Sequence, residues 1–134
     1  MRSTKIVTSF IKDNDKLLLL KRSDRVKTMK GLWAGISGII EKNEEPLSRA
    51  KIEIYEETGI SEDKLELIKS GKELDISSPQ YENHEWKIFP FLFESRDPII
   101  KLNWENSEYR WIKADELKNY PVVPSLDKVL FCLL

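Results

Sequence analysis

The chain has 134 residues, which is the size of one domain with a single hydrophobic core. Its 22 basic and 23 acidic residues give a formal net charge of −1, which argues against a general nucleic-acid coat protein and against a polybasic membrane binder. We therefore expect one domain over residues 1–134 whose contacts with phosphate or nucleic acid are local.

Strands and helices alternate along the chain. The pattern of residues 6–11 predicts a strand, and a turn at Asp13 and Asn14 leads into the apolar run 16–21, which we expect to pair with it as a buried central strand. Residues 33–40 are predicted to form a strand or a strand-like turn, and 65–69 with 72–76 another strand or a bent pair. Two more strands are predicted at 85–94 and 108–113.

Three segments are predicted to be helical. The first covers residues 47–58 and is followed by Gly59, which fits a left-handed C-terminal cap. A short helix begins at Ala114, and a last one follows Pro124 with apolar residues at helical spacing. Helices that cover both faces of a mixed sheet make an α/β/α sandwich the expected fold.

The sequence shows no signal of secretion or membrane insertion. The single cysteine, Cys132, lies in the apolar run VLFCLL and cannot form an internal disulfide, so we expect a buried thiol in a cytoplasmic protein. The first residues alternate in polarity, unlike a signal peptide, and no run approaches the roughly 20 apolar residues of a membrane span.

Acidic residues are concentrated in the segment 38–60. At about 100° per residue, the apolar side chains of the predicted helix form one narrow stripe, and Glu53, Glu56 and Glu57 form a second stripe beside it. Like charges one turn apart repel each other unless a cation lies between them. Partly buried carboxylates suit Mg²⁺ or Mn²⁺, which also take phosphate oxygens as ligands. A solvated Glu-rich helix surface is the alternative.

This segment resembles the signature of the Nudix hydrolases. That signature is a glycine, five residues, a glutamate, seven residues, and then Arg-Glu-apolar-any-Glu-Glu-any-Gly-apolar. Its fixed positions are filled, in chain order, by Gly38, Glu44, Ile52, Glu53, Ile54, Glu56, Glu57, Gly59 and Ile60. Only the arginine is missing, because Ile52 stands in its place. The flanking segments are arranged as in that family, so the resemblance covers nearly the whole chain.

The resemblance implies a Nudix fold and metal-dependent hydrolysis of a nucleoside diphosphate linked to another group. It implies that Glu53, Glu56 and Glu57 act as catalytic residues and, with the backbone carbonyl of Gly38, bind Mg²⁺ or Mn²⁺. The expected partner is a nucleotide-type small molecule, and homodimer formation is left open. A weaker similarity to Nudix domains fused to ribose-bisphosphate isomerase or initiation-factor-like proteins leaves open whether the chain is part of a longer fusion.

An extra catalytic acid from outside the signature is also expected. The candidates are Glu82, Glu85 and Glu108, and the sequence does not choose among them because each also fits an ordinary surface acid.

Substrate binding has several candidates. Arg22 and Arg25 belong to the basic segment 21–30, which either steers a polyphosphate or forms a solvated loop. Trp33 and Trp86 either stack on a base or pack against the protein.

The missing arginine supports a rival class of function, a Nudix-shaped nucleotide-binding or regulatory module without turnover. An arginine guanidinium holds carboxylates in a bidentate geometry, and Ile52 cannot do so. Arg49, however, lies one turn before Glu53, on the acidic side of the helix. It either supplies part of the missing guanidinium or forms an ordinary surface pair.

Overall fold

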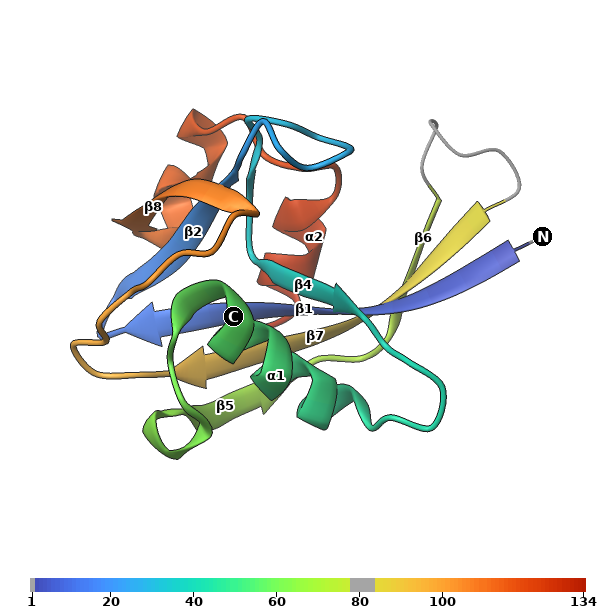
Figure 1. Ribbon diagram of the computed structural model, residues 1–134, viewed down its shortest axis with the longest axis horizontal. Coiled ribbons are helices and arrows are strands. Elements are labelled where there is room, and N and C mark those ends of the chain that lie inside the picture. Colours follow the sequence, from blue (N-terminus) through green and yellow to red (C-terminus); the bar gives the residue numbers. More distant parts are fainter. Residues whose placement is uncertain (1, 78–83) are drawn as a thin grey trace.

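The structure is a computed structural model that describes residues 2–77 and 84–134. In this part of the chain, eight strands form one mixed sheet with the order β3-β2-β1-β7-β5, to which β4, β6 and β8 are attached (Figure 1). The strands are β1 (Arg2–Asp13), β2 (Lys16–Arg22), β3 (Trp33–Ala34), β4 (Ile36–Ile39), β5 (Glu66–Ser70), β6 (Leu74–Ser77), β7 (His84–Glu94) and β8 (Asn106–Ile112). The helices are α1 (Pro46–Thr58) and α2 (Leu126–Phe131), with 3₁₀ turns η1 (Glu62–Lys64) and η2 (Ala114–Asn119).

The long strand β1 organises the sheet. It runs parallel to β7 over its whole length, from Arg2 opposite His84 to Lys12 opposite Glu94. On its other side it pairs antiparallel first with β4 and then, next to the turn, with β2. All the remaining pairings are antiparallel, so the sheet is mixed as predicted.

The predicted strand 33–40 is divided into two short strands at Gly35. β3 pairs with β2, whereas β4 pairs with β1. A Cβ atom at Gly35 would lie 2.9 Å from the carbonyl oxygen of Ser9, so the chain passes close to β1 at this glycine. The division lets one segment join two neighbouring strands of the sheet.

Strand β2 is buried on both faces, as its apolar run predicts. Leu17 and Leu19 belong to the core under α2, whereas Leu18 and Leu20 belong to the core under α1. The two helices therefore cover opposite faces of the sheet, which confirms the expected α/β/α sandwich. By contrast, all residues of β5 are exposed, because this strand lies at the edge of the sheet.

Helix α1 begins and ends where the sequence indicates. Pro46 occupies its first turn, and Gly59 follows it with φ of 80°, a left-handed conformation that glycine adopts without strain. The Gly59 N–H donates to the carbonyl oxygen of Tyr55 at 2.9 Å, which closes the last turn.

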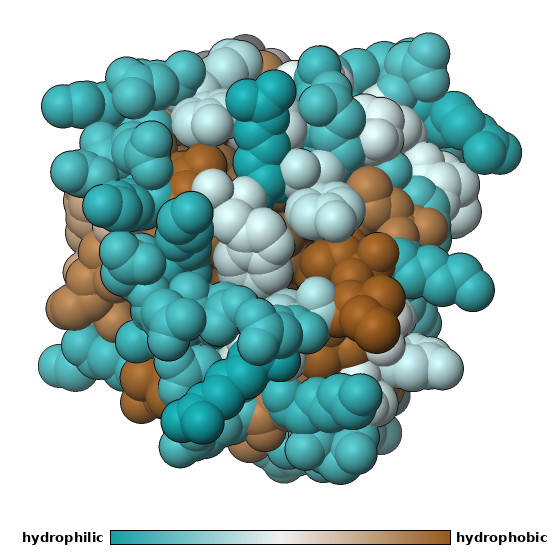
Figure 2. Space-filling model, turned by 90° about the vertical axis from the view of Figure 1, so that its left-hand side faces the viewer, coloured by the Kyte–Doolittle hydropathy of each residue, from teal (hydrophilic) through white to brown (hydrophobic). Residues whose placement is uncertain are grey.

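The polarity of the surface and the character of the helices were compared with what a membrane-spanning protein needs. Figure 2 shows one face on which hydrophilic side chains separate the apolar areas from one another. Within residues 2–77 and 84–134, neither helix has the length and apolar character needed to span a bilayer. Cys132 is half-buried, and burial raises the pKa of its thiol.

Candidate active site

Helix α1 carries three acidic residues and rests on β4 and β1. Its apolar stripe turns Ala50 and Ile54 into the core, where both are completely buried. This orientation places Glu53 directly over Gly38 of β4, because a Cβ atom on Gly38 would lie 2.2 Å from the carboxyl carbon of Glu53. The glycine at the start of the 38–60 segment therefore leaves the space that the Glu53 side chain occupies.

Glu57 is the buried acid of the site, with only 4% of its surface exposed. Its Oε1 accepts a hydrogen bond from the side-chain amide of Asn106 at 3.2 Å. Its Oε2 is buried and has no hydrogen-bond partner among the residues that the structure describes. Burial raises the pKa of Glu57 well above its ordinary range, and the charges of Glu105 and Glu53 raise it further. An unpartnered buried carboxylate oxygen is costly unless a ligand meets it.

Glu105, which the sequence analysis missed, belongs to the same site. Burial raises the pKa of Glu105, the charge of Arg22 opposes the rise, and the charge of Glu56 adds to it. The pKa of Glu53 is also raised by burial, although a hydrogen bond from Arg49 opposes this. The neighbouring Asn106 donates to Glu57, which places the backbone at Glu105 beside α1, and the charges of Glu53, Glu56 and Glu105 each raise the pKa of another of these acids. We call Glu53, Glu56, Glu57 and Glu105 the acidic cluster.

The loop that carries Glu105 is fixed to the rest of the protein by three hydrogen bonds. The Ser23 N–H donates to the carbonyl oxygen of Glu105 at 2.8 Å, and the Ser23 hydroxyl donates to that of Trp104 at 2.7 Å. Further back, the Lys101 N–H donates to the carbonyl oxygen of Thr58 at 2.8 Å. The end of β2 and the end of α1 thus hold this loop beside the cluster.

Arg49 connects the cluster to the segment before α1. Its Nε and Nη2 donate to the two carboxylate oxygens of Glu44 at 3.0 and 2.5 Å, and its Nη1 donates to Oε2 of Glu53 at 3.0 Å. Glu44 also accepts the Glu41 N–H at 2.7 Å. Ile52, at the signature position of the arginine, is 41% exposed to solvent.

The predicted substrate-binding residues lie in different surroundings. Arg22 folds back on the segment 21–30, where its Nε and Nη2 donate to the Thr28 carbonyl oxygen at 3.2 and 3.0 Å, and its charge acts on Glu105. Arg25 is exposed. Trp33 is only 6% exposed, and its ring packs edge-on against Tyr120. This burial favours the packing role among the two that the sequence left open for Trp33.

Two of the three predicted extra acids, Glu85 and Glu108, lie close to lysine side chains. Glu108 forms an exposed ion pair with Lys21 at 3.4 Å, and Glu85 lies 3.8 Å from the ammonium group of Lys87. Glu82 lies outside the described residues. Glu105, which was not among these candidates, is the acid outside the signature whose charge acts on Glu57.

The chemistry of the cluster fits a hard divalent cation. Carboxylate oxygens are the ligands that Mg²⁺ and Mn²⁺ prefer, and the buried Oε2 of Glu57, which has no hydrogen-bond partner among the described residues, is such a donor atom. Within residues 2–77 and 84–134, no three His, Cys, Asp or Glu side chains converge on one point where an ion would sit. The acidic cluster therefore matches a divalent cation in the type of its donor atoms.

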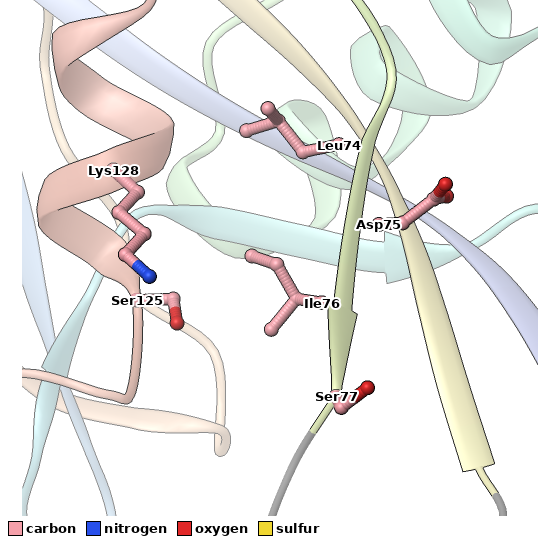
Figure 3. Close-up of a pocket in the computed structure, with 6 residues that line it drawn as sticks. All are labelled: Leu74, Asp75, Ile76, Ser77, Ser125 and Lys128. Carbon is pink, nitrogen blue, oxygen red and sulfur yellow. The ribbon is translucent and has the colours of Figure 1, made fainter.

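Two hollows lie outside the cluster. One, of about 200 Å³, separates β6 from the start of α2; Leu74 and Ile76 point into it toward Ser125 and Lys128, whereas Asp75 points away (Figure 3). The other, of about 610 Å³, lies between the start of β1 and the segment before α1. Its lining residues are Ser3, Thr4, Lys5, Ile39, Ile40, Glu41, Lys42, Asn43, Glu44, Pro46 and Phe89. Because Glu44 lines it, this second hollow adjoins the partner of Arg49.

Known proteins resemble this chain over most or all of its length. The family model of the NUDIX domain matches residues 2–132. A nucleoside triphosphatase, NudI, of Escherichia coli O81 (strain ED1a) is 28% identical over 97% of this chain and 96% of its own length. An RNA pyrophosphohydrolase of Bartonella henselae is 32% identical over 63% of this chain and 58% of its own length.

A solved structure shows the same fold. The MutT protein from Methanosarcina mazei Go1 superimposes with a TM-score of 0.76 at 22% identity, over 97% of this chain and 91% of that one. Its identity is too low to transfer a substrate, but the agreement extends over the whole α/β/α arrangement. With the family model covering residues 2–132, it follows that this chain belongs to the Nudix family and is a hydrolase of that family.

Proposed function

We propose that this Nudix hydrolase cleaves the pyrophosphate of a nucleoside diphosphate linked to another group, with Mg²⁺ or Mn²⁺ as cofactor. The observation that carries the proposal is the buried Oε2 of Glu57, which has no hydrogen-bond partner among the described residues and lies within a group of four acids. Such a group is costly for the fold alone. It becomes favourable when a divalent cation and a polyphosphate bind.

The chain supplies ligands for the metal from two elements. Glu57 and Glu53 are the proposed principal ligands, Glu56 is a further ligand or a water-activating base, and the backbone carbonyl of Gly38 completes the set. When bound, the metal neutralises pyrophosphate oxygens and activates the attacking water. Glu53 is already held against β4 by its contact with Gly38, so one ligand has its place before metal binds.

Glu105 is the proposed acid from outside the signature. Its raised pKa brings the carboxylate closer to the range in which a general base accepts a proton at neutral pH, and such a base contributes about 10² to 10⁴ in rate. The hydrogen bonds from Ser23 hold the backbone at Glu105 and Trp104 next to the cluster.

The substrate is proposed only by class. One relative is named a nucleoside triphosphatase and the other an RNA pyrophosphohydrolase, which supports a substrate that contains a phosphoanhydride bond. The hollow of about 610 Å³ next to Glu44 has the size of a site for a small molecule and offers room for a group attached to the pyrophosphate. Arg22 and Arg25 remain proposed phosphate contacts, since both lie in the basic segment that adjoins Glu105 through Arg22.

A nucleotide-binding or regulatory module is the second candidate, and the exposed Ile52 in the arginine position favours it. A substrate panel separates the two functions. Nucleotide sugars, ADP-ribose, dinucleoside polyphosphates, NADH, coenzyme A, and ordinary and oxidised nucleoside triphosphates are incubated with the protein in Mg²⁺, in Mn²⁺ and in excess chelator.

We expect metal-dependent release of a phosphate-containing product from at least one compound, and none in chelator. Binding of the same compounds is measured in parallel by calorimetry. Measurable binding without any metal-dependent product would refute the enzymatic proposal and favour the binding module.

A further inference from the structure

We propose that Arg49 is the positioning residue of the acidic cluster, holding Glu53 in place from one turn upstream and thereby supplying the guanidinium that the signature places at residue 52. The inference rests on the proposed function, because it assigns a role within the same site. It also concerns metal binding alone, so it is testable without a substrate.

The geometry of Arg49 is that of a fixed bridge. Two of its nitrogens bind both oxygens of Glu44, and the third binds Oε2 of Glu53 at 3.0 Å. An arginine with all three nitrogens engaged is held in one orientation, and a planar bidentate pair adds to that rigidity. Of the two oxygens of Glu53, it is Oε2 that accepts from Arg49.

The bridge is sheltered from solvent. The side chains of Arg49, Glu44 and Glu53 are 16%, 22% and 13% exposed, unlike those of an ordinary surface pair. On the same helix, Lys51 pairs with a Glu62 side chain that is 72% exposed. The variant Lys51→Ala is therefore a matched control, because it removes a surface ion pair from the same helix.

Glu44 gives the bridge its fixed end. Its Oε1 also accepts the backbone N–H of Glu41 at 2.7 Å, which ties the segment between β4 and α1 to the same carboxylate. Arg49 is thus anchored to the backbone through Glu44, and its hydrogen bond to Glu53 in turn fixes the position of that carboxylate. On the other side, Glu53 meets Gly38, so its carboxylate is fixed between a guanidinium and strand β4.

Ile52 does not share this position. It is 41% exposed, and it lies about 100° around the helix from Glu53, whereas Arg49 precedes Glu53 by one turn on the same side. The structure therefore contains a guanidinium at the cluster although the signature position lacks one. Arg49 carries the same positive charge as the arginine of the signature, but it comes from one helical turn before Glu53 instead of from residue 52.

The test compares Arg49→Ala, Arg49→Lys and the control Lys51→Ala in two assays. The first is binding of Mn²⁺ to the protein without substrate, followed by electron paramagnetic resonance of the free ion. The second is kcat and KM at saturating metal on the substrate identified for the wild type. Circular dichroism and thermal unfolding establish that each variant is folded, and Arg49→Lys keeps the positive charge if Arg49→Ala does not fold.

Charge and position predict opposite signs for Mn²⁺ binding. Removing a cation from beside a metal site would by charge alone tighten metal binding. We expect Arg49→Ala to weaken Mn²⁺ binding severalfold instead, because Glu53 loses its fixed place, and to lower kcat more than tenfold with a smaller change in KM. Arg49→Lys should lie between, since one ammonium group cannot replace the two-sided fork.

Three results would overturn the inference. These are Mn²⁺ binding by Arg49→Ala that equals or exceeds the wild type, a kcat that matches Lys51→Ala, or a gain in turnover from Ile52→Arg in the natural background. If the wild-type protein binds Mn²⁺ but hydrolyses nothing, the proposed function fails, while the Mn²⁺ comparison still decides the role of Arg49.

Discussion

Replacing Glu57 by glutamine tests whether the acidic cluster is a metal site or a repulsive surface. The substitution keeps the shape of the side chain and removes its charge. In the protein without metal, the buried Oε2 of Glu57 has no partner among the described residues, and an unsatisfied buried polar group costs about 1–3 kcal/mol. The amide remains polar, so we expect it to recover only part of this cost, about 1 kcal/mol.

Metal should reverse the order of stability. A ligand at about 100 times its Kd stabilises the folded state by about 2.7 kcal/mol. The wild type should gain this amount in saturating Mg²⁺, whereas Glu57→Gln should gain much less because a principal ligand has lost its charge. The variant is then the more stable protein in chelator and the less stable one in Mg²⁺.

Urea unfolding with and without Mg²⁺ measures both differences, and the hydrolysis assay should show that turnover collapses. Glu62→Gln is the control, because it makes the same chemical change on a side chain that is 72% exposed. If Glu57→Gln keeps both the Mg²⁺ stabilisation and the turnover of the wild type, the cluster is only a solvated acidic surface and the reasoning is refuted.

Two further predictions concern the other acids. Burial raises the pKa values of Glu53 and Glu57 in the folded state above the ordinary 4.5 of the unfolded state. Between the unfolded and the folded pKa of each group, the folded state binds more protons than the unfolded state, so stability falls as pH rises through that window. Without metal, the urea midpoint should therefore increase from pH 7 to about pH 5.5, above the range in which the lowered pKa of Glu44 acts in the opposite sense; a flat or falling midpoint contradicts this. Glu105→Gln should lower kcat at least about tenfold at saturating metal, whereas Glu108→Gln should stay near the wild type, and equal effects of the two would remove Glu105 from the proposed chemistry.

The fold was accessible from the sequence where the pattern is local. Leu17 to Leu20 predict a strand buried on both faces, and the alternation of these four leucines between two cores is what the structure shows. Gly59 ends α1 in the left-handed conformation that its position indicates. The division of residues 33–40 into β3 and β4 was not accessible, because it depends on how closely Gly35 approaches β1.

The site was accessible only in part, for the same reason. The acids of α1 follow one helical spacing, which a sequence displays directly. Glu105 follows no such spacing, and the contact between Asn106 and Glu57 joins residues that are 49 positions apart. The available signal was an acid three residues before the predicted strand 108–113. Glu108 in the same region was considered instead, and in the structure it pairs with Lys21.

Trp33 is a candidate whose two possible roles the sequence could not separate. A tryptophan in a glycine-containing segment next to basic residues fits a stacking platform, and composition does not distinguish this from core packing. Its burial depends on the far end of the chain, where the Trp33 N–H donates to the Pro121 carbonyl oxygen at 2.9 Å and the ring meets Tyr120. Contacts between segments so distant in sequence carry no periodic signal.

The lack of an arginine at residue 52 and the lack of a partner for Oε2 of Glu57 are two separate features of the acidic cluster. Arg49 reaches Glu53 at one side, and the charge of Arg22 acts on Glu105 at the other. Among the described residues, neither Arg49 nor Arg22 donates to Glu57, whose Oε1 accepts a hydrogen bond from the neutral amide of Asn106. A buried charge without a partner costs several kcal/mol of stability. Moving Arg49 to residue 52 would not supply Glu57 with a positive charge. The arginine positions the cluster, and a divalent cation is the charge that would still be required between its acids.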